Sequence, residues 1–278
     1  MPDQPTYETI RVEKEDRIAW AILNRPEKRN AMSPQLHREM DAALDALAYD
    51  PDCEILVLTG AGEAFCAGQD IQLFFREAGK DPAAMHRARQ ASSNWRWHKL
   101  STFPKPTIAM INGFCFGGAF TQACACDFAI AADDAVFGLS EVNWGILPGG
   151  IVSWNVAQVL NFRDGLYYAM TGDTFDGKTA KEIGFVNFSV PKAELRNTTI
   201  ALAKKLMQKS PAAMRYTKEA IRAVRYMSEP QAADYLAAKS DALRFNDRER
   251  GRDQGMRQFL DEKRYRPGLG HYERETKD

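Results

Sequence analysis

The residues best suited to chemistry lie within 112–150, where a pair of glycines is followed by a single carboxylate. Gly117 and Gly118 stand just before an apolar run, and Glu141 follows among apolar and small residues. Glycines at the start of an element let backbone N–H groups approach a ligand closely. A carboxylate among large apolar side chains loses water, which raises its pKa and suits it to act as an acid or base near neutral pH. A reaction at a carbon next to a carbonyl group requires at least two things. These are N–H donors that bind the oxyanion and one carboxyl group of this kind that transfers protons.

A second glycine-bearing segment, residues 64–71, follows a predicted strand in the same way as Gly117 and Gly118 do. Sheets of the α/β class place ligands at the carboxyl ends of their strands. If the two segments lie side by side, the N–H groups of Gln69 and Gly118 can point at one oxygen and stabilise an enolate or a tetrahedral oxyanion. The alternative is that both glycine sites are ordinary tight turns. Neither segment has the glycine spacing of a dinucleotide-binding or phosphate-binding loop.

Other side chains near these segments have both a functional and a structural interpretation. Thr121 either faces the same pocket or bonds back to its own helix. Phe74 and Trp144 either wall an aromatic pocket or belong to the core. Lys28 either grips a phosphate from its loop or lies in a solvated turn. Glu141 itself has the alternative of a satisfied surface or cap carboxylate.

The predicted elements that carry these residues alternate between strands and helices. Strands are expected at 17–23, 54–59, 107–111 and 128–131. The last three are near-continuous apolar runs of the kind found in buried parallel strands. Ser33 is placed to cap a helix that has Pro34 at its first position, and an apolar stripe follows at helical spacing. This alternation predicts right-handed βαβ units and an α/β sheet covered by helices.

The chain is predicted to become mostly helical after residue 150. Helical patterns with few strand signals run over 155–183 and 192–265, and Asp176-Gly177-Lys178 is expected to start a helix. Residues 247–255 form a charge run, which favours a solvated linker or cap over a nucleic-acid patch. The predicted organisation is one α/β core with a helical C-terminal part that covers the core or serves oligomerisation.

Composition limits the partners of this 278-residue chain. Lysine plus arginine equals aspartate plus glutamate at 37 each, so no general attraction to nucleic acid or to an anionic membrane is expected. No apolar run approaches the roughly 20 residues needed to span a bilayer, and residues 1–15 resemble neither a secretory signal nor a transit peptide. The five cysteines have mostly apolar surroundings and no zinc-ligand spacing, so buried free thiols in the cytoplasm are expected.

Several of these segments together resemble the enoyl-CoA hydratase/isomerase superfamily, also called the crotonase superfamily. The resemblance covers nearly the whole chain and rests on residues 23–32, 58–60, 65–70, 105–109 and 112–150. It implies a spiral ββα core over 1–200 and a helical trimerisation region over 201–278, in a homotrimer or a dimer of trimers.

The resemblance also implies an acyl-CoA thioester substrate whose carbonyl oxygen lies between the N–H groups of Gln69 and Gly118. The residues expected to contact the CoA thioester are Lys28, Ala67, Gly68, Gln69, Asp70, Ile71, Gln72, Gly118, Ala119 and Phe120. No cofactor beyond the CoA moiety of the substrate, no metal, no nucleic acid and no membrane partner is expected.

Within the superfamily the chain is similar to the hydroxycinnamoyl-CoA hydratase-lyases, which form aromatic aldehydes such as vanillin. The similarity lies in residues 95–97, 115–121, 137–146, 258–261 and 266–269. Ordinary hydratases carry two glutamates, whereas here Thr121 stands at the first position and Glu141 at the second, as in the hydratase-lyase group. The catalytic residues that this similarity implies are Glu141, Gln69, Gly118 and Thr121.

The implied reaction hydrates an arylpropenoyl-CoA such as feruloyl-CoA or 4-coumaroyl-CoA. Retro-aldol cleavage then gives an aromatic aldehyde and acetyl-CoA, with one carboxylate cycling between base and acid. Gln69 replaces the methionine usual in this group, where only the backbone is needed for the oxyanion.

Two positions depart from the hydratase-lyase pattern. Phe74 and Ala237 stand where that group places tyrosines that bind the substrate phenol, and together with Trp144 they form the expected substrate pocket. Because a buried phenol without a partner costs ~1–3 kcal/mol, the alternative is an enoyl-CoA hydratase acting on an altered, non-phenolic aryl or other acyl-CoA without cleavage. A catalytically silent binding protein of the same fold is a third possibility, against which the intact Gly68, Gly118 and Glu141 argue.

Overall fold

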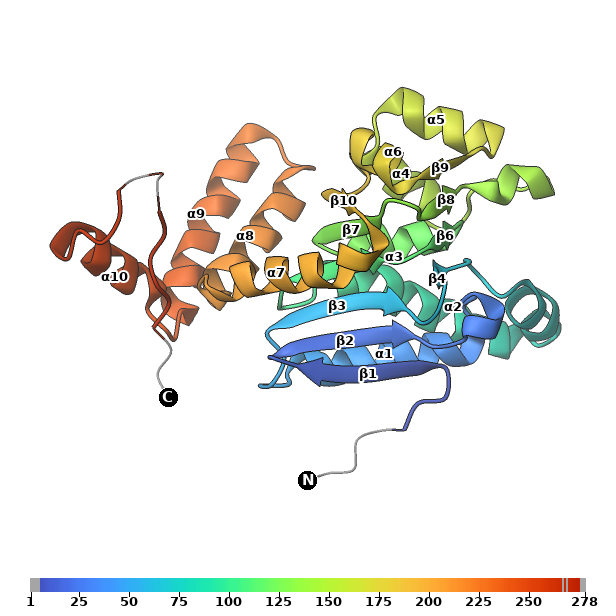
Figure 1. The fold of residues 1–278 in the computed structure, drawn as a ribbon, viewed down its shortest axis with the longest axis horizontal. Coiled ribbons are helices and arrows are strands. Elements are labelled where there is room, and N and C mark those ends of the chain that lie inside the picture. Colours follow the sequence, from blue (N-terminus) through green and yellow to red (C-terminus); the bar gives the residue numbers. More distant parts are fainter. Residues whose placement is uncertain (1–5, 267, 269, 276–278) are drawn as a thin grey trace. The chain divides into compact units, whose positions relative to one another are not determined.

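The computed structural model describes residues 6–266, 268 and 270–275, and it divides the chain into two compact units. The first unit contains the chain up to Phe103 together with Thr107–Ile200. The second contains Pro104–Pro106 and the chain from Ala201 onward. Figure 1 shows both units, and each is described by itself below.

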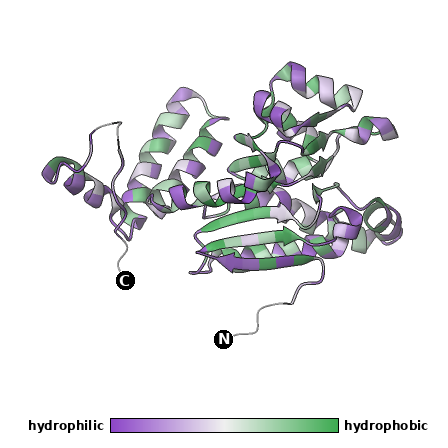
Figure 2. Cartoon of the chain, viewed as in Figure 1, coloured by the Kyte–Doolittle hydropathy of each residue, from purple (hydrophilic) through white to green (hydrophobic). Residues whose placement is uncertain are grey.

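The larger sheet of the first unit has six strands among the described residues, in the order β1-β2-β3-β5-β7-β10. These strands are β1 (Ile10–Glu15), β2 (Ile18–Leu23), β3 (Ile55–Gly60), β5 (Thr107–Ile111), β7 (Phe128–Ala132) and β10 (Phe188–Val190). β1 pairs with β2 in antiparallel fashion, and each later pair is parallel. All residues of β2 and β3 are buried, whereas β1 exposes most of its residues, and Figure 2 shows this contrast in hydropathy. The buried parallel strands therefore require cover on both faces.

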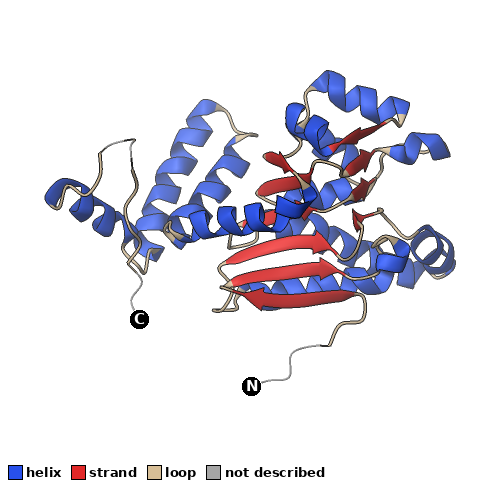
Figure 3. Ribbon diagram, viewed as in Figure 1, coloured by secondary structure: helices blue, strands red, loops and turns tan. Residues whose placement is uncertain are grey.

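A second, smaller sheet of four strands lies among the described residues in the order β4-β6-β8-β9. Its strands are β4 (Ala64–Cys66), β6 (Phe114–Phe116), β8 (Val136–Gly138) and β9 (Thr174–Asp176), all short in Figure 3. Three times the chain leaves a strand of the larger sheet and enters the smaller sheet within a few residues, from β3 to β4, β5 to β6 and β7 to β8. The turn from β5 to β6 requires glycine, because a Cβ on Gly113 would lie 1.8 Å from the carbonyl oxygen of Glu63.

The helices of the first unit include α1 (Pro34–Ala48), which packs against β1 and β2 (Figure 1). The Ser33 side chain accepts a hydrogen bond from the Leu36 N–H group and so caps this helix as predicted. The other α-helices that start in this unit are α2 (Pro82–Ser93), α3 (Ala119–Ala125), α4 (Val152–Val159), α5 (Phe162–Thr171), α6 (Gly177–Glu182) and α7 (Leu195–Met207). Short helical segments bear on the site, namely η1 (Pro26–Lys28), η2 (Ile71–Glu77), η4 (Asn94–Lys99) and η5 (Ser140–Trp144).

The expectation that residues 155–183 are mostly helical with few strand signals is confirmed, since α4, α5 and α6 cover most of them. The exception is β9, where Phe175 is buried and stacks on Phe137 of the partner strand β8. A three-residue strand has too little periodicity to be recognised, and tertiary pairing decides its structure. Residues 247–255, expected to be a solvated linker or cap, contain the start of α10 (Gly251–Met256) and so are not a linker throughout.

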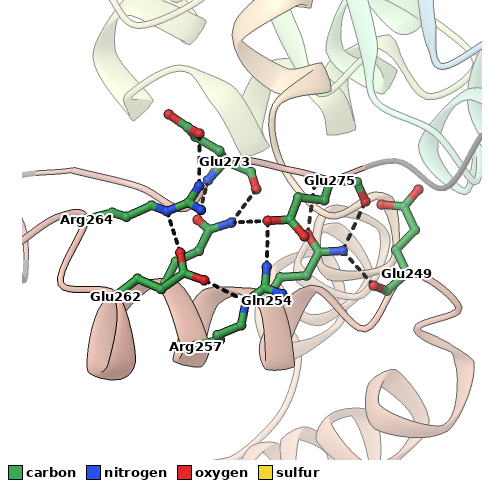
Figure 4. A network of polar contacts seen from close by, with 8 residues as sticks. Glu249, Gln254, Arg257, Glu262, Arg264, Glu273 and Glu275 are labelled. Atoms are coloured by element: carbon green, nitrogen blue, oxygen red, sulfur yellow. Dashed lines mark hydrogen bonds and ion pairs between the residues drawn. The ribbon is translucent and has the colours of Figure 1, made fainter.

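The second unit is helical, and its last described segment is tied to α10 and η7 (Arg257–Asp261) by polar contacts (Figure 4). Its other helices are α8 (Pro211–Val224) and α9 (Glu229–Asn246), which pack together. Arg274 donates two hydrogen bonds to the Glu249 carboxylate, at 2.8 and 2.7 Å, and Arg257 pairs with Glu275 at 2.6 Å. The charge run therefore anchors the C-terminal segment through hydrogen bonds to Glu249. Pro267 and Leu269, which carried part of the resemblance, lie outside the described residues.

The predicted fold class, an α/β core with a parallel sheet and a helical C-terminal region, is confirmed. All five cysteines are free, and four of them are buried, as expected. Within the described part of the chain no helix combines the length and the apolar character needed to cross a membrane. The same residues include no group of three His, Cys, Asp or Glu side chains arranged to hold a metal ion.

Candidate active site

The two glycine-bearing segments after β4 and β6 lie in direct contact. Gly68 has φ +89°, and a Cβ there would lie 3.0 Å from the Phe116 carbonyl oxygen and 3.6 Å from the Gly118 nitrogen. Only glycine allows this approach with this backbone conformation. Met32 fixes the first segment from behind: its N–H group donates to the Gly68 oxygen and its carbonyl accepts from the Asp70 N–H group. The prediction that these segments meet is therefore confirmed.

The backbone N–H groups of Gln69 and Gly118 are available to a ligand. Among the described residues neither group has a hydrogen-bond acceptor, whereas the N–H groups of Asp70 and Gly117 are both paired. Gly118 stands immediately before α3, where the Phe120 and Thr121 N–H groups are already bonded to the Gly117 and Gly118 carbonyl oxygens. Two unpaired donors on touching segments can bind one oxygen and stabilise negative charge on it.

The Gln69 side chain is anchored in a hydrogen-bond chain that sequence reasoning missed. The Trp95 indole N–H donates to His37 Nδ1 at 2.8 Å, and His37 Nε2 lies 2.8 Å from Gln69 Oε1. Because the indole is only a donor, Nδ1 must accept and Nε2–H must donate to Gln69. Gln69 Nε2 in turn donates to Ser92 Oγ at 3.2 Å. A methionine at position 69 could not make these bonds, so the side chain matters more than its backbone role alone suggested.

Burial keeps the His37 ring neutral. Loss of water is the main cause that lowers the His37 pKa to about 3, with Arg96 contributing in the same direction. The neutral ring can hold the single tautomer that the Trp95 bond selects. Its function is thus to orient Gln69, since it cannot exchange protons near neutral pH.

Arg96 lies against the second segment. Its Nη1 donates to the Gly118 carbonyl oxygen at 3.2 Å, and its Nε donates to the Ser92 carbonyl oxygen at 3.2 Å. The Trp95-Arg96-Trp97 sequence, a cation between two tryptophans, was the only signal that a charge would be held here among large apolar side chains.

The Glu141 carboxylate lies beside the glycine pair. It is carried by η5, and a Cβ on Gly117, where φ is +51°, would lie 2.9 Å from Glu141 Oε1. Glu141 Oε2 is buried and has no hydrogen-bond partner among the described residues. Burial raises the pKa of this carboxyl group above its ordinary value. The structure therefore contradicts the alternative that Glu141 is a surface or cap carboxylate with its hydrogen bonds satisfied.

Thr121 and Phe120 follow Gly118 on α3. Thr121 is 1% exposed, and its Oγ1 has no partner among the described residues, so it does not bond back to its own helix. The Phe120 ring is fully buried and packs on Phe137 and Phe185. Its backbone N–H group donates to the Gly117 carbonyl oxygen, so the predicted contact of Phe120 with a thioester stays a prediction.

The residues predicted to hold the CoA moiety differ in their surroundings. Asp70 is already engaged, since it accepts from Arg25 at 2.9 Å and caps η2 through the Leu73 N–H group. Lys28 and Gln72 are exposed, and Ile71 is 58% exposed. Ala67 is half-buried, and Ala119 is buried at the start of α3.

The three residues predicted to form the substrate pocket differ in how far their side chains are exposed. Phe74 is 5% exposed and packs edge-on against His37, with ring centroids 5.5 Å apart. Trp144, on η5, is 71% exposed and so is not a core residue. Ala237 is exposed on α9 of the second unit, and its part in the pocket stays a prediction.

Comparisons with known proteins identify the family of the chain. The family model described as enoyl-CoA hydratase/isomerase matches residues 13–267. The chain is 52% identical over 269 residues to a hydroxycinnamoyl-CoA hydratase-lyase of Pseudomonas fluorescens, covering 96% of this chain and 98% of the relative. It is 35% identical over 218 residues to a probable enoyl-CoA hydratase of Mycobacterium bovis, covering 78% of this chain and 82% of that protein.

Solved structures give the same result for the fold. The crystal structure of an enoyl-CoA hydratase from Bacillus anthracis superimposes with a TM-score of 0.83 at 27% identity, covering 96% of this chain and all of that one (100%). The sequence match, the shared fold and the touching glycine segments beside a desolvated carboxylate lead to one assignment: the chain belongs to the enoyl-CoA hydratase/isomerase family.

Proposed function

We propose that this enzyme hydrates an arylpropenoyl-CoA thioester and cleaves the product to an aromatic aldehyde and acetyl-CoA. The observation that carries the proposal is the position of Glu141, a desolvated carboxylate against Gly117, one residue from the free Gly118 N–H group. The likeness to the hydroxycinnamoyl-CoA hydratase-lyase of Pseudomonas fluorescens supports the substrate class. Thr121 supports cleavage, because it stands where two-glutamate hydratases carry their second carboxylate.

In the first step water adds across the carbon–carbon double bond. The thioester oxygen accepts hydrogen bonds from the Gln69 and Gly118 N–H groups, which makes the β-carbon electrophilic. Glu141 takes a proton from water as its oxygen bonds to the β-carbon, and the electrons of the double bond move into an enolate. Glu141 then returns the proton to the α-carbon, so the carboxylate is regenerated.

In the second step the bond between the α- and β-carbons breaks. Glu141 takes the proton of the new β-hydroxyl group, the aldehyde carbonyl forms, and the bonding electrons leave as the enolate of acetyl-CoA. The same two N–H groups hold that enolate oxygen, and Glu141 returns the proton to the enolate carbon. One water is consumed in all, and a single carboxylate serves both steps.

Phe74 supports a proposal for the ring substituents of the substrate. Its side chain offers no hydroxyl group and is packed against His37. A free phenol facing it would lose a hydrogen bond, at a cost of ~1–3 kcal/mol. We therefore propose a preference for a ring whose para position carries an ether or no donor.

The test uses four thioesters: feruloyl-CoA, 4-coumaroyl-CoA, 4-methoxycinnamoyl-CoA and crotonyl-CoA. Loss of the enoyl thioester is followed by absorbance, and the products are separated by chromatography. The proposal predicts an aromatic aldehyde and acetyl-CoA in equal amounts, with 4-methoxycinnamoyl-CoA turned over fastest. A β-hydroxyacyl-CoA with no aldehyde would make the enzyme a hydratase, and no reaction with any of the four would reject both activities.

We also propose assembly into a homotrimer or a dimer of trimers. Large apolar side chains on α5 and the loop before α4 are exposed in the single chain, among them Phe162 at 79%, Leu147 at 72% and Met170 at 68%. Such surfaces are usually covered by a partner. Light scattering on the purified protein gives the mass directly, and a monomer at micromolar concentration would contradict the proposal.

A further inference from the structure

Arg96 is a buried cation, fixed by hydrogen bonds, that has no role in the mechanism proposed above. Among the described residues no carboxylate lies within ion-pair distance of its guanidinium, although it makes hydrogen bonds to two backbone carbonyls. Its titratable neighbours are Cys66 and His37. Burial raises the Cys66 pKa to about 12 and lowers the His37 pKa to about 3, so both are neutral near pH 7.

The positive charge of Arg96 remains unbalanced in this environment. Burial lowers its pKa to about 10, which still leaves the guanidinium protonated near neutral pH. A cation without an opposite charge is a costly thing to keep away from water. A negative charge is therefore expected to develop close to Arg96 during the reaction.

The geometry places this charge against Gly118 and close to Gln69, the two residues that carry the free N–H groups. Arg96 Nη1 lies 3.2 Å from the Gly118 carbonyl oxygen and 3.1 Å from the position that a Gly118 Cβ would take. The Gln69 side chain approaches the same position, with its Cγ at 3.7 Å. Arg96 therefore touches the turn that carries one donor and adjoins the residue that carries the other.

We propose that Arg96 is a positioning residue of the oxyanion site, which holds Gly118 through its carbonyl group and supplies the positive charge that balances the enolate oxygen. This inference rests on the proposed function. Negative charge develops on the thioester oxygen in both steps, and fixed positive charge behind the N–H donors stabilises it strongly where water is scarce. The hydrogen bond also restrains a glycine, the residue type with the greatest backbone freedom.

The test separates charge from hydrogen bonding through three variants. Arg96→Lys keeps the charge, Arg96→Gln keeps a donor without charge, and Arg96→Met keeps neither. Arg89→Met is the matched control, since Arg89 is an exposed arginine on the adjoining helix α2. Circular dichroism and thermal melting establish that each variant is folded.

The spectroscopic probe is 4-methoxybenzoyl-CoA, which has no carbon–carbon double bond and so can be neither hydrated nor cleaved. Its carbonyl is conjugated to the ring, so its absorbance moves to longer wavelength when the carbonyl is polarised. We expect the wild-type enzyme and Arg89→Met to give the full red shift. We expect Arg96→Lys to keep most of it, and Arg96→Gln and Arg96→Met to lose most of it with little change in Kd.

Turnover gives an independent measure. We expect kcat to fall roughly 10-fold or more in Arg96→Gln and Arg96→Met, with KM nearly unchanged. A red shift in Arg96→Gln equal to that of the wild type would overturn the role of the charge while leaving the proposed function intact. A bound probe that shows no red shift even in the wild type would instead reject the oxyanion site itself. If Arg96→Met fails to fold, the comparison of Arg96→Lys with Arg96→Gln decides the question.

Discussion

The Gln69 side chain is held at both ends of its amide, whereas one oxygen of the Glu141 carboxylate has no partner among the described residues. The donor side, formed by Gln69 and Gly118, is backed by His37 and Arg96. The carboxylate side is carried by η5, whose Trp144 is largely exposed. Donors must stay where charge will form, while a base must gain and lose a proton. The difference therefore matches a division between a fixed electrostatic wall and a group left free to change its charge.

The largest effect is expected from Glu141→Gln, which removes the base and leaves the donor side untouched. We predict that kcat falls by about 10²–10⁴-fold, while 4-methoxybenzoyl-CoA binds with its full red shift. Because burial disfavours the charged carboxylate, the neutral amide should also unfold at the same or a higher temperature at pH 7. Retained turnover would show that another group is the base.

The pH profile of the wild-type enzyme tests the same carboxylate without mutation. The reactive form is ionised, and burial raises its pKa above the ordinary 4.5. Activity should therefore fall as pH decreases through this raised value, so the acid limb of kcat/KM lies above pH 4.5. An acid limb at or below that pH would mean that Glu141 is not desolvated in the working enzyme.

Two glycine substitutions perturb the carboxylate side and the donor side separately. Gly117→Ala puts a methyl group 2.9 Å from Glu141 Oε1, whereas Gly68→Ala puts one 3.0 Å from the Phe116 carbonyl oxygen on the donor side. Both glycines have positive φ, so each variant should lose roughly 1–3 kcal/mol of stability. We predict that Gly117→Ala loses kcat but keeps the red shift of the bound probe, and that Gly68→Ala loses both. Equal red shifts in the two variants would contradict the proposed separation.

His37 gives the donor side a pH-dependent stability. Its pKa is about 3 when folded against 6.5 for the free side chain, so below pH 6.5 only the unfolded chain takes up this proton. The stability due to neutral His37 is therefore complete above pH 6.5 and is lost toward pH 3, by up to about 1.4 kcal/mol per pH unit. We predict that the advantage of the wild type over His37→Gln in urea unfolding shrinks by roughly 2 kcal/mol in total from pH 6.5 to 4.5. A difference that does not vary with pH would refute a buried, neutral His37.

Local patterns were sufficient to predict strands of the larger sheet and helix α1, but not the short elements β4, β6 and η5 that carry or adjoin the site residues. β3 and β5 were recognisable because buried parallel strands are continuously apolar, and α1 because Ser33 and Pro34 mark its start. The sequence also singled out Gly68 and Gly117. The structure explains why glycine stands there, because the chain adopts positive φ at both positions, where other residues are strained. Glu141 stood out for its apolar neighbours, and the structure gives it the raised pKa that they suggested.

The supports behind the donors could not be predicted in the same way. His37 and Gln69 are 32 residues apart in the chain, and Ser92 is 23 residues beyond Gln69. Neither pair has a spacing that repeats within a helix or a strand, so only the fold reveals that they meet. The roles of Trp95 and Arg96 depend on the same long-range contacts, and their sequence shows only a cation in an apolar setting.

The smallest effect is expected from Thr121→Val, which tests whether the hydroxyl group beside the site is used. Thr121 Oγ1 is buried without a partner among the described residues, and valine has nearly the same shape. If the hydroxyl contacts only protein, the variant should gain about 1 kcal/mol of stability, because an unsatisfied buried group has been removed, with kcat unchanged. We predict instead a modest fall in kcat without that gain, since a site that moves protons through one carboxylate benefits from a second group able to hold water. Measured kcat and unfolding free energy of the same preparation decide between the two, and unchanged kcat would assign Thr121 to packing and leave Glu141 as the only side chain in proton transfer.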